Sequence, residues 1–141
     1  MSGALMRAAE EVREDSETLE AREFSRESAA NADFSDLTFR NVVFRACCFT
    51  GCRFDGAAFY GCTFSGCLLA DCRFPVSFWS HSGLMGCKAD GTDFRRSRFK
   101  DCRLEESSLR YGNLSGVILE RVILRDVLLL ESVLSESKLS K

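Results

Sequence analysis

Residues 48–66 read CFTGCRFDGAAFYGCTFSG, and phenylalanine returns at every fifth position, at Phe49, Phe54, Phe59 and Phe64. The period continues from Phe34 to Leu139 without an insertion, and the 22 residues at its centres are Phe, Leu, Trp or, once, Ala. An internal repeat of this kind predicts the architecture of a chain more directly than any single helix or strand does.

The residue two before each centre is small or of moderate size and, like the centre, is never charged. Residues 31–141 contain 28 charged side chains, and random placement would put about eleven of them on these 44 positions. A period of five fits neither an α-helix nor a flat strand, because both would scatter the centres over several faces. We therefore expect short extended pieces separated by bends, with these two positions pointing into a core.

The expected bends have their own marker, a glycine two residues after the centre. A tight turn or a positive φ is easiest there without a Cβ. The glycines at this position are Gly51, Gly56, Gly61, Gly66, Gly86, Gly91 and Gly116.

Units such as ADFSD, CRFDG, CTFSG, TDFRR, SRFKD and GNLSG resemble the A(D/N)LXX unit of the pentapeptide-repeat family, over residues 32–141. The resemblance implies an all-β solenoid, a right-handed quadrilateral β-helix with four units per coil and about five and a half coils. Residues 1–31 are expected to form an N-terminal α-helical cap followed by a lead-in strand or turn over residues 18–31.

The expected cap is an amphipathic helix of about four turns in an Ala-, Glu- and Arg-rich stretch. Its apolar stripe would cover the first coil or, alternatively, serve as a partner-binding arm. The stripe follows helical spacing through Leu5, Ala8, Ala9, Val12, Ser16 and Leu19.

Near the C-terminus the outward positions become apolar, and we expect no capping segment after Leu139. An exposed apolar patch at a solenoid end indicates an interface. Because related pentapeptide-repeat proteins dimerise end to end through their C-terminal coils, we expect a homodimer. The alternatives are a cap formed by other partners and an apolar surface without a partner. The residues expected at the interface are Ile118, Ile123, Leu128, Leu130 and Val133.

Seven of the eight cysteines occupy the small inward position, and only Cys48 points outward as a candidate reactive thiol. The chain shows no secretory signal or membrane span, so we expect a cytoplasmic location in which the inward thiols stay reduced and act as small hydrophobes. Their C-x₄-C spacing and a core filled with phenylalanine disfavour zinc. Disulfides within the stacks Cys47/Cys67/Cys87 and Cys52/Cys72 are the other alternative.

No catalytic, cofactor or metal motif is recognisable around His81, the single histidine, so we expect no enzyme activity and no cofactor. Two outward groups could bind a partner. One is the patch Phe78, His81 and Met85; the other is the basic run Arg95, Arg96, Arg98, Lys100 and Arg103. Acidic residues interrupt this run, which favours a mixed solvated surface over direct nucleic-acid binding.

These features favour a non-catalytic protein-interaction module of the adaptor, immunity or scaffold type, with an unidentified protein partner and no membrane. The alternative is a DNA mimic that binds DNA gyrase or topoisomerase IV, as implied by a distant resemblance to the quinolone-resistance members of the family. Residues 31–141 carry thirteen acids and fifteen bases, and the repeat has no projecting loops. Both features weaken the alternative.

Overall fold

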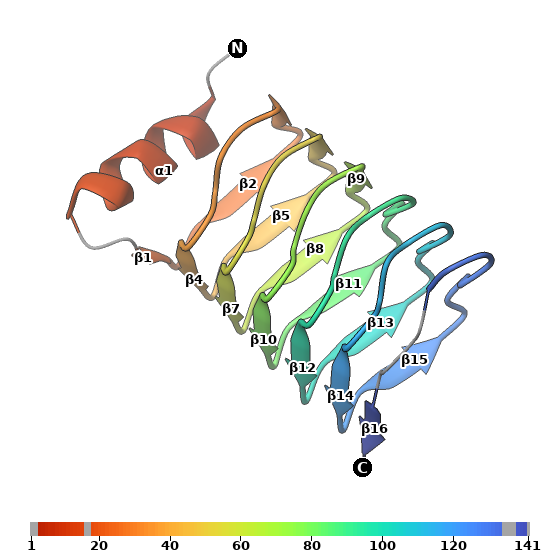
Figure 1. Ribbon diagram of the computed structural model, residues 1–141. Coiled ribbons are helices and arrows are strands. Elements are labelled where there is room, and N and C mark those ends of the chain that lie inside the picture. Colours follow the sequence, from red (N-terminus) through yellow and green to blue (C-terminus); the bar gives the residue numbers. More distant parts are fainter. Residues whose placement is uncertain (1–2, 16–17, 134–137, 141) are drawn as a thin grey trace.

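The computed structural model describes residues 3–15, 18–133 and 138–140, and of Asp15, Leu139 and Ser140 only the backbone. These residues form a β-solenoid of short parallel strands behind one helix, α1 (Ala4–Asp15). The helix lies across the N-terminal end, and the last strand lies at the opposite end (Figure 1).

The first two sides of the solenoid are continuous parallel sheets. The seven-stranded β1 face consists of β1 (Thr18–Glu20), β4 (Thr38–Arg40), β7 (Ala58–Tyr60), β10 (Phe78–Ser80), β12 (Arg98–Lys100), β14 (Ile118–Glu120) and β16 (Lys138–Ser140). The six-stranded β2 face consists of β2 (Glu23–Ser25), β5 (Val43–Arg45), β8 (Thr63–Ser65), β11 (Gly83–Met85), β13 (Arg103–Glu105) and β15 (Ile123–Arg125).

The other two sides are held by fewer strand pairs. The β3 face consists of β3 (Ser28–Ala30), β6 (Cys48–Thr50) and β9 (Leu68–Ala70), and single bridges continue it from Leu68 to Leu128. The fourth side, the bridge face, is held by single parallel bridges from Asp33↔Arg53 to Asn113↔Val133. On every side a residue pairs with the one twenty positions later, as in Thr18↔Thr38, which confirms four units per coil.

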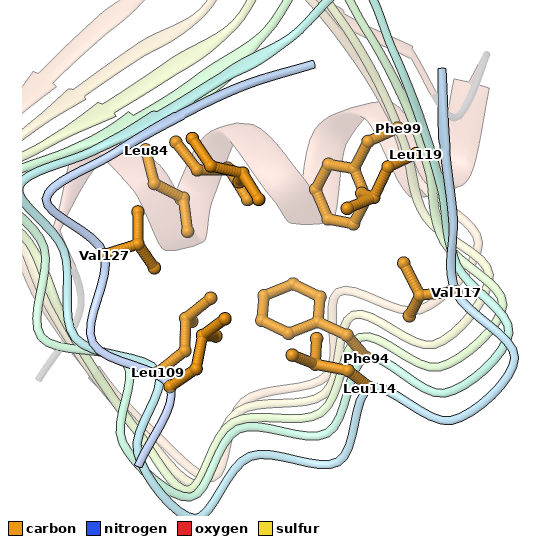
Figure 2. Close-up of a pocket in the computed structure, with 11 residues that line it drawn as sticks. Leu84, Phe94, Phe99, Leu109, Leu114, Val117, Leu119 and Val127 are labelled. Carbon is orange, nitrogen blue, oxygen red and sulfur yellow. The ribbon is translucent and has the colours of Figure 1, made fainter. Parts of the chain in front are cut away.

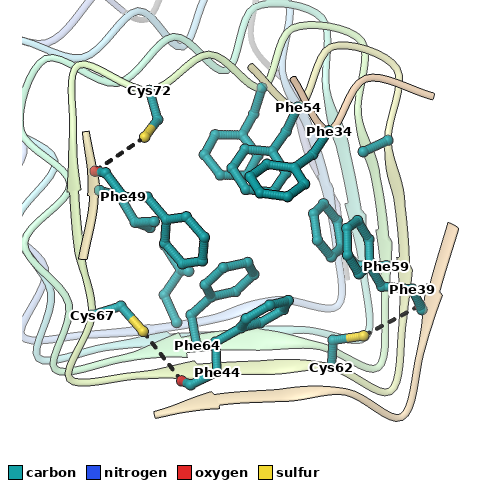
Figure 3. Close-up of a cluster of buried hydrophobic side chains, with 14 of the residues drawn as sticks. Phe34, Phe39, Phe44, Phe49, Phe54, Phe59, Cys62, Phe64, Cys67 and Cys72 are labelled. Atoms are coloured by element: carbon teal, nitrogen blue, oxygen red, sulfur yellow. Dashed lines mark hydrogen bonds between the residues drawn. The ribbon is translucent and has the colours of Figure 1, made fainter. Parts of the chain in front are cut away.

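The centres form columns of stacked side chains inside the solenoid (Figure 3). The ring of Phe54 lies 5.0 Å from that of Phe34 and 4.5 Å from that of Phe74, centroid to centroid. On the β1 face the ring of Phe59 lies 4.1 Å from that of Trp79. All of these rings are buried, so the predicted core positions are confirmed.

The bends adopt a left-handed conformation whichever residue occupies them. The seven glycines predicted there have φ between 61° and 73°. Non-glycine residues take the same conformation at the equivalent position of other units, among them Asn41, Val76 and His81. The glycines therefore mark the bend without being required for it, although a β-branched side chain such as that of Val76 is strained there.

The first coil begins earlier than predicted. Residues 18–31, expected to be a lead-in, pair with the following coil through β1, β2 and β3 and bury Leu19, Phe24 and Ala29 as centres. The prediction missed this coil because charged residues occupy two of its inward positions. The guanidinium of Arg22 lies over the Phe24 ring at 5.0 Å, and Glu27 binds the helix.

Helix α1 covers this first coil, so its predicted role as a cap is confirmed. Leu5, Ala8 and Ala9 are buried, whereas Leu19, expected in the same stripe, lies in β1; Ser16 is outside the described residues. The amide of Leu5 donates a hydrogen bond to Oε1 of Glu27 at 3.1 Å, which satisfies one of the free N–H groups at the start of the helix.

Strain at Val76 supplies a test of the bend geometry. This residue has φ 58° and is 64% exposed, so replacing it removes little burial. Val76→Asn should stabilise the protein by about 1 kcal/mol, because Asn tolerates the left-handed region better than a β-branched residue. Urea denaturation measures the change.

The matched control is Val43→Asn in β5, where the backbone is extended and valine is favoured. No stabilisation is expected there. Equal effects at the two positions would contradict the assignment of strain to Val76.

Candidate functional site

The C-terminal end of the solenoid carries a concentration of exposed apolar side chains. The centres become progressively more accessible, from Leu114, 9% exposed, to Leu124, 43% exposed. The outward side chains of Leu128, Leu130 and Val133 are 56%, 61% and 49% exposed. Of the predicted interface residues, Ile123 belongs to this group, whereas Ile118 is half-buried in β14.

At the same end lies an apolar cavity of about 300 Å³ (Figure 2), which is partly open to solvent, since its lining includes the exposed Leu124. Phe94 and Phe99 line it toward the rest of the core, where they stack on Phe74 and Trp79. Its remaining lining is entirely aliphatic. Those residues are Leu84, Leu104, Leu109, Leu114, Val117, Leu119, Leu124, Val127 and Leu129.

The cavity coincides with a change in the repeat. Up to Phe99 most centres are aromatic, and rings from adjoining faces touch, as Phe94 and Phe99 do at 5.7 Å. From Leu104 onward every centre is leucine, and the shorter side chains of Leu109, Leu114 and Leu119 leave the middle of the coil open (Figure 2). A cavity of this size in a core costs several kcal/mol unless something fills it.

A second surface lies on the β1 face, where aromatic side chains point outward. The ring of Phe78 lies 5.7 Å from that of Tyr60 in the preceding coil, and the guanidinium of Arg40 lies over the Tyr60 ring at 4.4 Å. Both rings are half-buried on the sheet surface. We call Arg40, Tyr60 and Phe78 the aromatic patch.

Around the corner from this patch, three of the predicted contact residues share a shallow recess. His81 stands at the bend after β10, Met85 lies in β11 and Arg103 in β13. Gly83, which has no side chain, lies between Thr63 and Arg103 in the sheet and forms part of the recess. The recess has a volume of about 280 Å³. Phe78, predicted in the same group as His81 and Met85, belongs to the aromatic patch instead.

Sequence comparison agrees with this architecture. The family described as "Pentapeptide repeat region" matches residues 57–134, more than half of the chain. The chain belongs to the pentapeptide-repeat family. A second description, "Pentapeptide repeats (8 copies)", matches residues 28–57 and 39–74. No match was found among curated protein sequences.

Solved structures similar to this pentapeptide-repeat protein share its fold at low sequence identity. A pentapeptide repeat protein from the cyanobacterium Cyanothece 51142 has 13% identity and a TM-score of 0.62, covering 98% of this chain and 100% of its own. QnrB1, a plasmid-mediated fluoroquinolone resistance protein, has 19% identity and a TM-score of 0.52. The match covers 85% of this chain and 73% of the QnrB1 chain.

A third similar structure, a pentapeptide repeat protein from the Arabidopsis thaliana thylakoid lumen, has 18% identity and a TM-score of 0.53. The match covers 72% of this chain and 68% of that protein. At these identities the likeness establishes the fold alone.

The basic run of this pentapeptide-repeat protein is interleaved with acidic partners. Arg98 pairs with Glu120 at 2.6 Å and, through this hydrogen bond, holds the pKa of that carboxyl below its usual value. Arg95 pairs with Asp93 at 3.0 Å and Arg103 with Glu105 at 3.2 Å. Arg96 stands at a bend and Lys100 ends β12. At least three of the five cations are thus already paired.

The described residues lack both a metal-binding cluster and a membrane-spanning helix. Among them, no three His, Cys, Asp or Glu side chains are grouped so that they could hold a metal ion. No helix in the described part of the chain is long and apolar enough to cross a membrane.

The thiols divide as the sequence predicts. Seven cysteines are buried and Cys48 is exposed. Six of the inward thiols donate to carbonyls of the preceding coil, as Cys62 does to the carbonyl of Phe39 at 3.2 Å (Figure 3), whereas Cys102 donates to the carbonyl of Lys100 at 3.3 Å. Burial raises the pKa of the Cys62 and Cys102 thiols, which disfavours the reactive thiolate form.

Two features escaped the sequence analysis. Tyr60 was not singled out, although a tyrosine at an outward position 18 residues before Phe78 must lie beside it once four units form a coil. The cavity was not foreseen either. Its signal was the change of centres from phenylalanine to leucine after Phe99.

The exposure of the thiols can be tested by chemical labelling. Under native conditions, a thiol reagent such as 5,5′-dithiobis(2-nitrobenzoate) should label one cysteine per chain rapidly, because only Cys48 is exposed. Cys48→Ser should abolish this fast phase, whereas Cys62→Ser should leave it unchanged. A fast phase that persists in the Cys48→Ser chain would contradict the burial of the other seven.

Proposed function

We propose that this pentapeptide-repeat protein is a non-catalytic protein-interaction module that binds a protein partner through the aromatic patch. The single observation that carries the proposal is the pair of outward rings, Tyr60 and Phe78, which lie 5.7 Å apart at a tilt of 51° on two adjacent strands of a regular sheet. Tyrosine, arginine and other aromatic anchors dominate the energetics of protein interfaces. Strand pairing on both sides holds these anchors in place, so little ordering cost is added on binding.

The surface around the patch has the composition of an interface centre. Between Gly56 and Cys87 only Asp71 and Arg73 are charged, and both lie away from the β1 and β2 faces. The middle coils therefore present two adjoining uncharged faces, with Arg40 and Arg98 on the neighbouring strands of the β1 face. A partner with an apolar centre and acidic residues at its rim fits this arrangement.

Paired glutamates on the patch test the proposal. The wild-type chain and the Tyr60→Glu/Phe78→Glu variant would be used as baits in quantitative pull-down from the source cells, with bound proteins measured by mass spectrometry. We expect the specific partner to be lost by at least tenfold, because two buried charges would oppose the interface.

The matched control is Ser35→Glu/Ser115→Glu, which adds the same charges to the bridge face. It should keep the partner. Equal capture by all three baits would refute the patch as the binding surface.

We further propose that two copies associate end to end through Ile118, Ile123, Leu128, Leu130 and Val133. The support is the concentration of exposed apolar side chains at this end, with Leu124 added to the predicted set. A closed two-fold contact would cover the same patch on both copies. Protein partners of other kinds could cover it instead, and solution mass separates these cases.

Light scattering tests the dimer. Leu128→Glu together with Leu130→Glu should convert a dimeric species into monomers, since four added charges would face each other across the contact. Ser108→Glu on the same face, further from the end, serves as the control. A wild-type monomer, or a double variant of unchanged mass, would contradict the dimer.

DNA mimicry toward gyrase or topoisomerase IV has weaker support. A mimic needs unpaired acidic side chains in a row, whereas on the bridge face Asp33, Asp55 and Asp93 lie within 4 Å of arginines. We therefore expect the purified protein not to inhibit gyrase supercoiling at micromolar concentration. Inhibition that is lost on acidic-to-amide substitution at these aspartates would instead establish the mimic.

A further inference from the structure

We propose that the cavity at the C-terminal end of the core is a binding site for one small uncharged apolar molecule, an aromatic or branched hydrocarbon about the size of two fused rings. The inference goes beyond the proposed interaction function and does not depend on it. It rests on the lining, the volume and the rigidity of the cavity.

The lining selects the chemistry of the ligand. Among the described residues, all eleven side chains that line the cavity are Leu, Val or Phe, and none of these can donate or accept a hydrogen bond. A charged or strongly polar molecule would lose its hydration without gaining a partner. Apolar cavities of roughly 150 Å³ in other proteins stay dry and bind benzene or xenon. At about 300 Å³ this cavity has room for a molecule of twice that size.

The cavity cannot easily collapse, because its walls are strands held at fixed spacing. The amide of Leu109 donates to the carbonyl of Leu128 at 2.8 Å, and the amide of Leu114 donates to the carbonyl of Val133 at 2.7 Å. Phe94 and Phe99 are fixed by their stacks on Phe74 and Trp79. A preformed apolar site loses little free energy to rearrangement when a ligand enters.

The cavity is lined within one chain, so a small molecule can occupy it in a monomer as well as in a dimer. A two-fold contact between C-terminal ends would place one cavity opposite the other, since both partners use the same surface. A small molecule is the occupant that the shape of each chain accommodates by itself.

A fluorescent apolar probe tests the site. The full chain would be titrated with N-phenyl-1-naphthylamine, an uncharged molecule whose emission rises in apolar surroundings. We expect saturable binding of one probe per chain and displacement of the probe by naphthalene.

Two neighbouring substitutions separate the cavity from the surface. Leu119→Phe introduces a ring into the cavity and should weaken probe binding at least tenfold. The fold accepts phenylalanine in this column, because Phe99 occupies the equivalent position in the preceding coil. Glu120→Phe adds the same ring on the outward side of the same strand and should leave the affinity unchanged. Circular dichroism confirms that both variants are folded.

Several results would overturn the proposal. These are the absence of saturable binding to the wild type, equal affinity in Leu119→Phe, or an equal loss in Glu120→Phe. The monomerising variant Leu128→Glu/Leu130→Glu should still bind the probe; loss there would place the site in an intermolecular contact instead of within one chain.

Crystals of the wild type under xenon pressure give a second measurement that needs no variant. Xenon is expected between Phe94, Phe99 and Leu109, and xenon found only at the outer surface would refute the site.

Discussion

Parallel pairing between residues twenty positions apart is the interaction on which the rest of this structure depends. Each strand has only three residues and buries little by itself, so a coil is stable only on its neighbours. The amides of Phe54 and Leu69, for example, donate to the carbonyls of Arg73 and Lys88 in the next coil at 2.6 and 2.7 Å. Because this register repeats on all four sides, every side chain lies above the one twenty residues earlier.

The register determines both the core and the surface. Inside, it stacks aromatic centres, and the Trp79 ring fits between Phe59 and Phe99 in its column. Outside, it brings Tyr60 and Phe78 together and lets Arg73 reach both Asp55 and Asp93. The two ends differ because their neighbours differ. Helix α1 covers the first coil, whereas the coils after Leu104 have leucine centres and line a partly open cavity.

The sequence predicts the core well because the core follows one rule at every unit. Burial of Cys62, exposure of Cys48 and the bend at Gly56 all follow from position within five residues. The first coil escaped this rule because Arg22 and Glu27 break it, each for a reason that exists only in three dimensions: a ring beneath the guanidinium and a helix start beside the carboxylate. Exceptions at an end of a solenoid are shaped by what covers that end.

The candidate sites were less predictable for a related reason. Outward positions carry no periodic signal, so the neighbourhood of Phe78 could be derived only after the number of units per coil was known. Predicting the cavity would also have required the side-chain conformations, since the cavity depends on how far the leucine side chains reach toward one another. Partner identity depends on the chemistry of these outward and terminal surfaces, which differs from protein to protein within one fold.

Removing one whole coil tests the twenty-residue register most directly. Deletion of residues 41–60 joins Arg40 to Gly61 and restores the register of every later coil. Deletion of residues 41–58 breaks the register. The first variant should keep its β-sheet circular dichroism and a single cooperative urea transition, whereas the second should lose both. Equal behaviour of the two variants would contradict the account.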